Sequence, residues 1–254
     1  MKIGSLKKII VFFKIYLLIS FSSFATTLNI ISTPETSVVI SEILVEYAKL
    51  GHSSINASFS QSTDLLDQIQ DGLAVDMVIT SHSDWISEMK QKGLIDITSI
   101  SNLFVDKLVI VSNIDQDEYN DLDLSELIHN IKHNKDFLFV IPDKTEIYTR
   151  KYVDLFLNKL DMPSWVYKYR IKSVKNISHY LSSNASDLAI MFYSQAYDDE
   201  NIKIVSKLDY DLYEQIVFQA AVVASENHQD AEDFLKFLKD KQAKVIYRKN
   251  GFTY

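Results

Sequence analysis

Residues 62–85 read STDLLDQIQDGLAVDMVITSHSDW. This stretch shows the alternation of helical and strand patterns that is found along the rest of the chain. Apolar residues recur at helical spacing from Leu65 to Ile69, and Gly72 then ends that pattern. The short apolar run Met77–Ile79 is typical of a buried strand, and Trp85 begins another helical period. A helix, a strand and a helix in so short a span predict an α/β protein.

The same alternation continues on both sides of this stretch. Further strands are expected at Leu28–Ile31, Ile55–Phe59, Val105–Val111, Phe137–Ile141, Leu188–Phe192, Ile202–Val205 and Ile216–Val223. Strands that alternate with helices predict sheets with largely parallel pairing. No linker rich in Pro, Gly or Ser divides the chain, so two lobes would have to be joined through strands. That arrangement is typical of binding proteins that close about a hinge.

Residues 1–25 have the composition of an export signal. Lysines near the start precede a short apolar run, and Ser23–Ala25 has the small–x–small form of a signal peptidase site. Lys14 interrupts the apolar run, which is too short to span a bilayer. We therefore expect a cleaved signal peptide over residues 1–25 and a soluble mature protein outside the cytoplasm.

The cysteine content and the net charge limit the compartment and the partners of the protein. The chain has no cysteine, which excludes a lipid-anchored cysteine and thiolate chemistry. An exported protein without a lipid anchor needs an enclosed compartment, so we expect the periplasm of a Gram-negative cell. Of the 26 Lys and Arg residues four lie in the leader, which leaves 22 against 34 Asp and Glu residues, or about −12. Such a surface repels nucleic acid and anionic lipid, so we expect neither as a partner.

Two helix starts contain hydroxyl groups at the ends of strands. Thr33 occupies an N-cap position, Pro34 the first helical position and Glu35 the first turn. Residues 61–64, Gln-Ser-Thr-Asp, open the next helix in the same way. Both starts lie at the sheet edge where open α/β folds bind ligands, and free N–H groups at helix N-termini favour anions. The pair suggests an anion site.

Other motifs point to no chemistry. His129 and His133 lie one turn apart without a third ligand, so we interpret them as a solvated helix face. The acidic segment 115–121 lacks the glycine and terminal glutamate of a calcium loop. No nucleophile elbow or phosphate-binding glycine loop is present, so we expect the protein not to be an enzyme.

The order of these motifs resembles the periplasmic molybdate-binding proteins of ABC transporters. Ser62–Trp85 resembles that family's SSTLxxxIxxGAPADLFISAxxxWM, and Ala189–Ala196 resembles its GIVYxSDA. The tail, Ala221–Phe252, matches in the same order. The resemblance implies a two-lobed type II periplasmic-binding-protein fold, α/β, with a mixed, mostly parallel sheet flanked by helices in each lobe. It places lobe I at residues 26–106 and 218–254, and lobe II at residues 107–217.

The resemblance also implies a site, a ligand and partners. Ser62 falls on a ligand serine, Ile177 on a backbone N–H donor, and Glu35 on the position of the first-loop serine. Phe192 falls on the pocket tyrosine, with Tyr193 displaced by one residue. The implied ligand is molybdate or tungstate, bound as an oxyanion without metal or cofactor. The implied partners are an inner-membrane permease and its ATPase, and the protein is expected to be a monomer.

Glu35 leaves alternatives open. A carboxylate that faces a dianion inside a dry cleft costs several kcal/mol. The first loop is therefore either shifted, so that Thr33, Thr36 or Ser37 supplies the hydroxyl, or the ligand has changed. A cationic or amphipathic solute would pair with the carboxylate. A third alternative is a ligand-free partner of a membrane protein.

Overall fold

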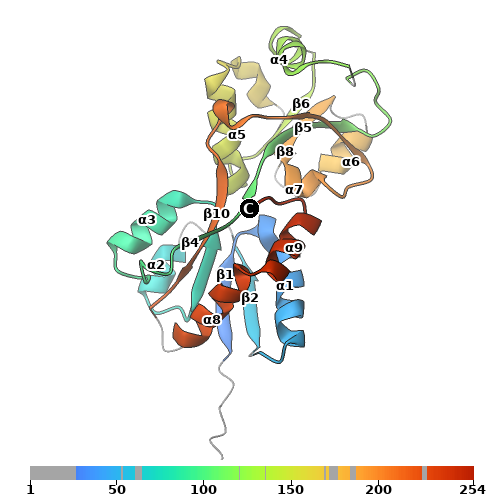
Figure 1. The fold of residues 1–254 in the computed structure, drawn as a ribbon. Helices are drawn as coiled ribbons and strands as arrows, with labels where there is room; N and C mark the ends of the chain where they lie inside the picture. Colours follow the sequence, from blue (N-terminus) through green and yellow to red (C-terminus); the bar gives the residue numbers. More distant parts are fainter. Residues whose placement is uncertain are drawn as a thin grey trace, which may run out of the picture.

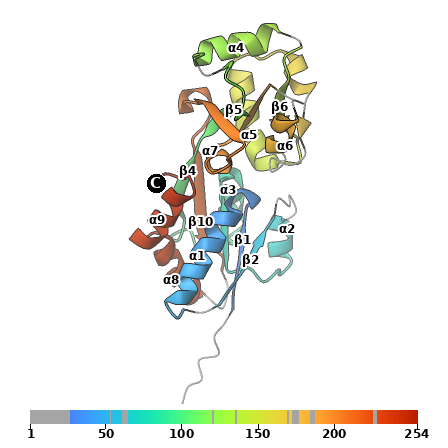
Figure 2. The ribbon, with the colours of Figure 1, turned by 90° about the vertical axis from the view of Figure 1, so that its right-hand side faces the viewer.

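Two lobes, each built on one β-sheet, make up the part of the chain that is described (Figures 1 and 2). The computed structural model describes residues 27–52, 54–60, 65–119, 121–134, 136–168, 170–171, 177–183, 187–224 and 228–254. The predicted signal peptide and Ser62 lie outside these ranges. Within them, no helix is both long enough and apolar enough to span a bilayer.

The sheet of lobe I has the strand order β2-β1-β3-β10-β4. Its strands are β1 (Leu28–Ser32), β2 (Ile55–Phe59), β3 (Met77–Thr80), β4 (Ser101–Asp106) and β10 (Ile216–Val222). The flanking helices are α1 (Ser37–Lys49), α2 (Leu65–Gln70), α3 (Ser83–Gln91), α8 (His228–Leu238) and α9 (Lys241–Lys249). β1 runs parallel to β2 and β3, whereas β10 runs antiparallel to β3 and β4.

The sheet of lobe II has the order β7-β6-β8-β5-β9. Its strands are β5 (Leu108–Asn113), β6 (Phe139–Pro142), β7 (Arg170–Ile171), β8 (Leu188–Phe192) and β9 (Ile202–Lys207). Its helices are α4 (Leu124–His133), α5 (Ile147–Lys159), α6 (Ile177–Ser182) and α7 (Tyr193–Ala196). The prediction of mixed sheets is confirmed. The expectation of mostly parallel pairing is not, because β5 and β10 run antiparallel to both of their neighbours, so that parallel and antiparallel pairs are equally frequent among the described strands.

Apolar periodicity explains why these elements form. Val39, Ile40 and Ile43 of α1 are buried on one face, and every residue of β3 is buried because helices cover both faces of the sheet. Tyr152 and Phe156 of α5 are buried in the same way.

The chain crosses between the lobes twice, first directly from β4 into β5, and then back through a segment that includes a 3-10 helix, Tyr210–Leu212. It leaves lobe I at Lys107, between β4 and β5, and returns through residues 208–215 into β10. The C-terminal residues pack beside this crossing, where Thr253 exchanges backbone hydrogen bonds of 3.0 and 2.6 Å with Val105. Gly251 has φ +82°, and a Cβ there would lie 2.9 Å from the Cβ of Tyr197. Lobe I therefore touches α7 of lobe II at this point.

Candidate functional site

The first loop, residues 33–36, joins β1 to α1 at the boundary between the lobes. The Thr33 N–H donates to Ile79 O at 3.2 Å, which fixes the loop to the end of β3. The Thr36 hydroxyl donates to Thr33 O at 2.7 Å and lies 2.5 Å from the Ser32 hydroxyl. The Thr33 hydroxyl is buried and has no hydrogen-bond partner. Of these two threonines, Thr33 is therefore the one with a hydroxyl free to bind a ligand.

Glu35 is the least satisfied side chain of this loop. Only 9% of the residue is exposed, and neither carboxylate oxygen has a hydrogen-bond partner. Burial raises the pKa of Glu35 to about 7, and the nearby carboxyl groups of Glu146 and Asp106 add to the rise. The nearby Thr33 hydroxyl and the Glu35 backbone N–H act to lower this pKa. Neither of them makes a hydrogen bond to the Glu35 carboxylate.

A small hollow lies on one side of the first loop, and we call it the hydroxyl hollow. Thr33, Ser60 and Thr80 of lobe I and Tyr148 of lobe II contribute its polar lining. The Tyr148 hydroxyl donates to Ser60 O at 3.4 Å, a long hydrogen bond that links the lobes. The hollow has a volume of about 10 Å³, which is about the space of one water molecule. A tetrahedral oxyanion needs more room than this conformation offers.

Helix α5 of lobe II closes the cleft over lobe I. The Tyr152 hydroxyl donates to Ser81 O at 2.7 Å in a buried hydrogen bond. Lys151 Nζ lies 3.3 Å from an oxygen of Asp84 at the start of α3. These contacts link the two lobes directly.

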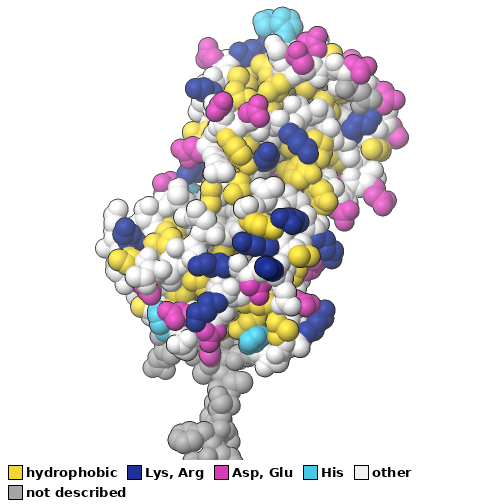
Figure 3. All heavy atoms as spheres, viewed as in Figure 1, with side chains coloured by type: hydrophobic (Ala, Val, Ile, Leu, Met, Phe, Trp, Pro, Cys, Tyr) yellow, Lys and Arg dark blue, Asp and Glu magenta, His cyan; other side chains and the backbone are white. Residues whose placement is uncertain are grey.

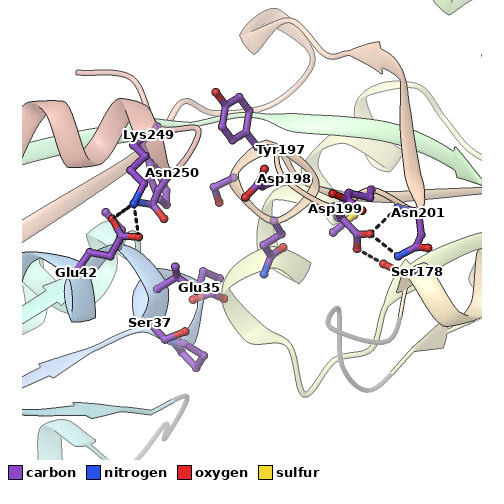
Figure 4. A pocket seen from close by; sticks show the side chains of 18 residues that line it. Glu35, Ser37, Glu42, Ser178, Tyr197, Asp198, Asp199, Asn201, Lys249 and Asn250 are labelled. Carbon is purple, nitrogen blue, oxygen red and sulfur yellow. Dashed lines mark hydrogen bonds and ion pairs between the residues drawn. The ribbon is translucent and has the colours of Figure 1, made fainter. Parts of the chain in front are cut away.

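A much larger hollow, which we call the interlobe cavity, lies on the other side of the first loop (Figure 4). Its volume is about 660 Å³. Glu35 and Ser37 of lobe I lie across it from Ser178 and Asp198 of lobe II, and Gln195 of lobe II also lines it. Thr33 and Glu35, two residues apart, thus line different hollows.

Asp106 connects the crossing between the lobes to α7. Its carboxylate accepts hydrogen bonds from the Ser194 hydroxyl at 2.6 Å and from the Lys107 N–H at 2.7 Å. Burial raises the pKa of Asp106 to about 6, and these hydrogen bonds limit the rise. Asp106 therefore orients α7, and with it one wall of the interlobe cavity.

Residues 28–253 match the family described as bacterial extracellular solute-binding protein. The chain belongs to this family. Its members bind solutes, which agrees with the expectation that the chain is not an enzyme. A cleft between two lobes is the arrangement that such a protein uses to enclose a solute.

Two relatives of this solute-binding protein have names that include a ligand. It is 22% identical over 220 residues to the molybdate-binding protein ModA of Haemophilus influenzae, covering 84% of this chain and 85% of the relative. The Escherichia coli protein of the same name is 23% identical over 221 residues, covering 84% and 83%.

Solved structures show the same fold. The substrate-binding domain of a putative molybdenum ABC transporter from Clostridium difficile superposes with a TM-score of 0.75 at 20% identity, covering 89% of this chain and 98% of that one. Iron-bound HitA from Pseudomonas aeruginosa gives 0.67 at 14% identity, covering 88% and 84%. The fold is shared by proteins with different ligands, so the site of this solute-binding protein has to be argued from its own residues.

The structure brings only some of the predicted site residues to the two hollows. Ser62 lies outside the described residues. Ile177 is fully buried at the first position of α6, and its neighbour Ser178 lines the interlobe cavity. Phe192 is fully buried in the core and lines neither hollow. Tyr193 also lines neither; its N–H donates to Lys107 O at 2.7 Å.

Sequence reasoning missed several residues that line the two hollows. Ser60 follows β2 and Thr80 ends β3, so both lie at strand ends beside the first loop. Ser194 and Gln195 lie in α7, directly after β8. The position of polar residues at or just after strand ends is the signal that would have found them.

The residues that could hold a metal lie outside the cleft. Among the described residues, Asp96, His228 and Glu232 form a group whose candidate ligand atoms lie within 4.8 Å of one another. His228 Nε2 lies 3.7 Å from Asp96 and 3.4 Å from Glu232, so ion pairing accounts for this group. His129 and His133 stack with ring centroids 4.2 Å apart, on α4.

Proposed function

We propose that this protein captures a tetrahedral oxyanion, molybdate or tungstate, and delivers it to an ABC importer. The observation that carries the proposal is the hydroxyl hollow, where neutral side chains from both lobes meet beside the start of α1. Neutral donors can pair with each oxygen of an anion without a buried cation. The names of the two ModA relatives support the choice of molybdate.

In this mechanism the lobes separate about the crossing at Lys107 and the return at residues 208–215, because the hollow holds about one water molecule as it stands. Thr33 supplies the first-loop hydroxyl and Ser62 a second hydroxyl. The Ile177 backbone N–H of lobe II, whose neighbour Ser178 lines the interlobe cavity, has to be brought to them by this movement of the lobes. Glu35 lines the interlobe cavity rather than the hydroxyl hollow, and its raised pKa of about 7 reduces the charge that its carboxyl places beside the anion.

The place of action follows from the leader and the family. We propose that residues 1–25 are cleaved and that the mature monomer works in the periplasm with a membrane permease and its ATPase. The family description is extracellular. A Bacillus subtilis relative, 22% identical over 232 residues, is named a putative ABC transporter substrate-binding lipoprotein.

Isothermal titration of the mature protein with molybdate, tungstate and sulfate tests the proposal. Molybdate and tungstate should bind, and Thr33→Val should weaken them at least about tenfold with little change in stability, since its hydroxyl has no internal partner. Thr36→Val is the matched control, because its hydroxyl bonds within the loop and its loss should lower stability by about 1 kcal/mol. No heat and no thermal shift with any of the three anions contradicts the proposal, and a non-oxyanion solute or a ligand-free role then takes its place.

A further inference from the structure

We infer that Asp96, His228 and Glu232 bind one Zn²⁺ ion on the surface of lobe I. His228 and Glu232 belong to α8, and Asp96 precedes β4. Helix α8 lies at the end of lobe I that points away from lobe II (Figures 1 and 2). The inference therefore concerns neither of the two hollows, and it is independent of the proposed function.

The ion pairs within this group are long, and their lengths suit ligands of one tetrahedral ion. His228 Nε2 lies 3.4 Å from Glu232 Oε1 and 3.7 Å from Asp96 Oδ2. Charge-assisted hydrogen bonds are shorter, at about 2.7–2.9 Å. Two atoms that bind Zn²⁺ at about 2.0–2.1 Å lie about 3.3–3.4 Å apart at the tetrahedral angle. The candidate ligand atoms of all three residues lie within 4.8 Å of one another, so small side-chain rotations bring them to one ion.

The chemistry of the three side chains selects the metal. One imidazole nitrogen and two carboxylate oxygens are ligands that Zn²⁺ accepts, and a water molecule then completes a four-coordinate site. The two carboxylates balance the charge of a divalent ion. Ca²⁺ and Mg²⁺ require six or more ligands, which are oxygen atoms, so an imidazole in a set of three disfavours both.

Asp96 is held in place with one oxygen directed to the group. Thr98 donates to Asp96 Oδ1 from its backbone N–H and from its hydroxyl, both at 2.8 Å. The Asp96 N–H donates to Val222 O at 2.9 Å, which fixes the residue to the end of β10. Oδ2 is the oxygen that lies near His228. Hydrogen bonds to the other oxygen of a carboxylate orient it as a metal ligand.

The group is accessible to an ion from solution. The side chain of Asp96 is 26% exposed, that of His228 42% and that of Glu232 36%. His228 and Glu232 lie one turn apart on α8, so both side chains are on the same face of the helix. Lys236, one turn further along, lies 2.8 Å from Asp233 and is thus engaged by a different carboxylate.

Calorimetric titration of the mature protein with ZnCl₂ at neutral pH, without an affinity tag, tests the inference. One Zn²⁺ ion should bind per chain. His228→Ala and Glu232→Gln should each weaken binding at least about tenfold, since loss of an outer-shell partner alone costs about 10–100-fold. CaCl₂ and MgCl₂ should give no comparable binding. Zn²⁺ should raise the melting temperature of the wild type more than that of either variant, because a bound ion stabilises the folded state.

His129→Ala is the matched control. His129 and His133 are a second pair of side chains one turn apart, on α4, with ring centroids 4.2 Å apart. This variant should bind Zn²⁺ like the wild type. An unchanged circular dichroism spectrum shows that each variant is folded.

Three results overturn the inference. The wild type binds no Zn²⁺, or His228→Ala and Glu232→Gln bind it as tightly as the wild type, or His129→Ala is the variant that loses binding, which assigns the ion to α4. Titration with molybdate decides the proposed function separately, whatever the result with Zn²⁺.

Discussion

Replacing Glu35 by Gln should make the protein more stable at alkaline pH relative to the wild type. Burial raises the pKa of Glu35 from 4.5 to about 7. The unfolded chain therefore loses its proton first as the pH rises, and the free energy of unfolding falls between about pH 4.5 and pH 7. The shift corresponds to about 3 kcal/mol at pH 8, since one pKa unit is about 1.4 kcal/mol. Glutamine keeps the shape and removes this loss.

Urea unfolding at several pH values from 4 to 8, at fixed ionic strength, measures this effect. The difference between Glu35→Gln and wild type should grow by about 3 kcal/mol in favour of the variant from pH 4 to pH 8. Glu46→Gln is the control, because an exposed ion pair such as Glu46–Lys49 contributes at most about 1 kcal/mol. If the curves of Glu35→Gln and wild type stay parallel over this range, Glu35 is hydrated or paired at neutral pH and the reasoning is refuted.

Three other substitutions test the contacts around the cleft. Tyr152→Phe removes a buried hydrogen bond of 2.7 Å to the Ser81 carbonyl of lobe I. Urea unfolding should show a free energy of unfolding lower by about 1–3 kcal/mol, and X-ray scattering should show a more open shape. An unchanged free energy and an unchanged shape contradict the role of Tyr152 in closure. Gly251→Ala should lower the melting temperature more than Gly72→Ala, because both have positive φ but only at Gly251 would a Cβ approach Tyr197 within 2.9 Å; equal shifts would show that α7 yields. Burial raises the pKa of Asp106 from 3.8 to about 6, so the free energy of unfolding should fall between about pH 4 and pH 6. Asp106→Asn should make this fall smaller. If the free energy of unfolding depends on pH in the same way in the variant and the wild type, Asp106 is not buried as described.

Much of the fold could be predicted from local pattern. The run Met77–Ile79 lies within β3, and Leu65 and Ile69, predicted at helical spacing, are buried on α2. These elements follow from periodic apolar residues, whose spacing requires a helix or a strand with a defined buried face. The balance of parallel and antiparallel pairing was not predictable in this way, because it depends on how β5 and β10 enter sheets built by distant segments.

The candidate site was predictable only in part. Thr33 and Glu35 were identified from the helix start, and the sequence indicated that a carboxylate there conflicts with an anion. It did not indicate that the two residues line different hollows, since that depends on which lobe II residues face each side of the loop.

The sequence by itself thus determined an α/β chain with a family resemblance and a first loop with an unusual acid, and it predicted an export leader. Tertiary structure alone decided that Glu35 is buried without a donor and that Gln195 lines the same cavity, with 159 residues between them. The physical reason is that periodicity is a property of neighbouring residues. Burial, and the pKa that follows from it, depends on the segments that fold against them.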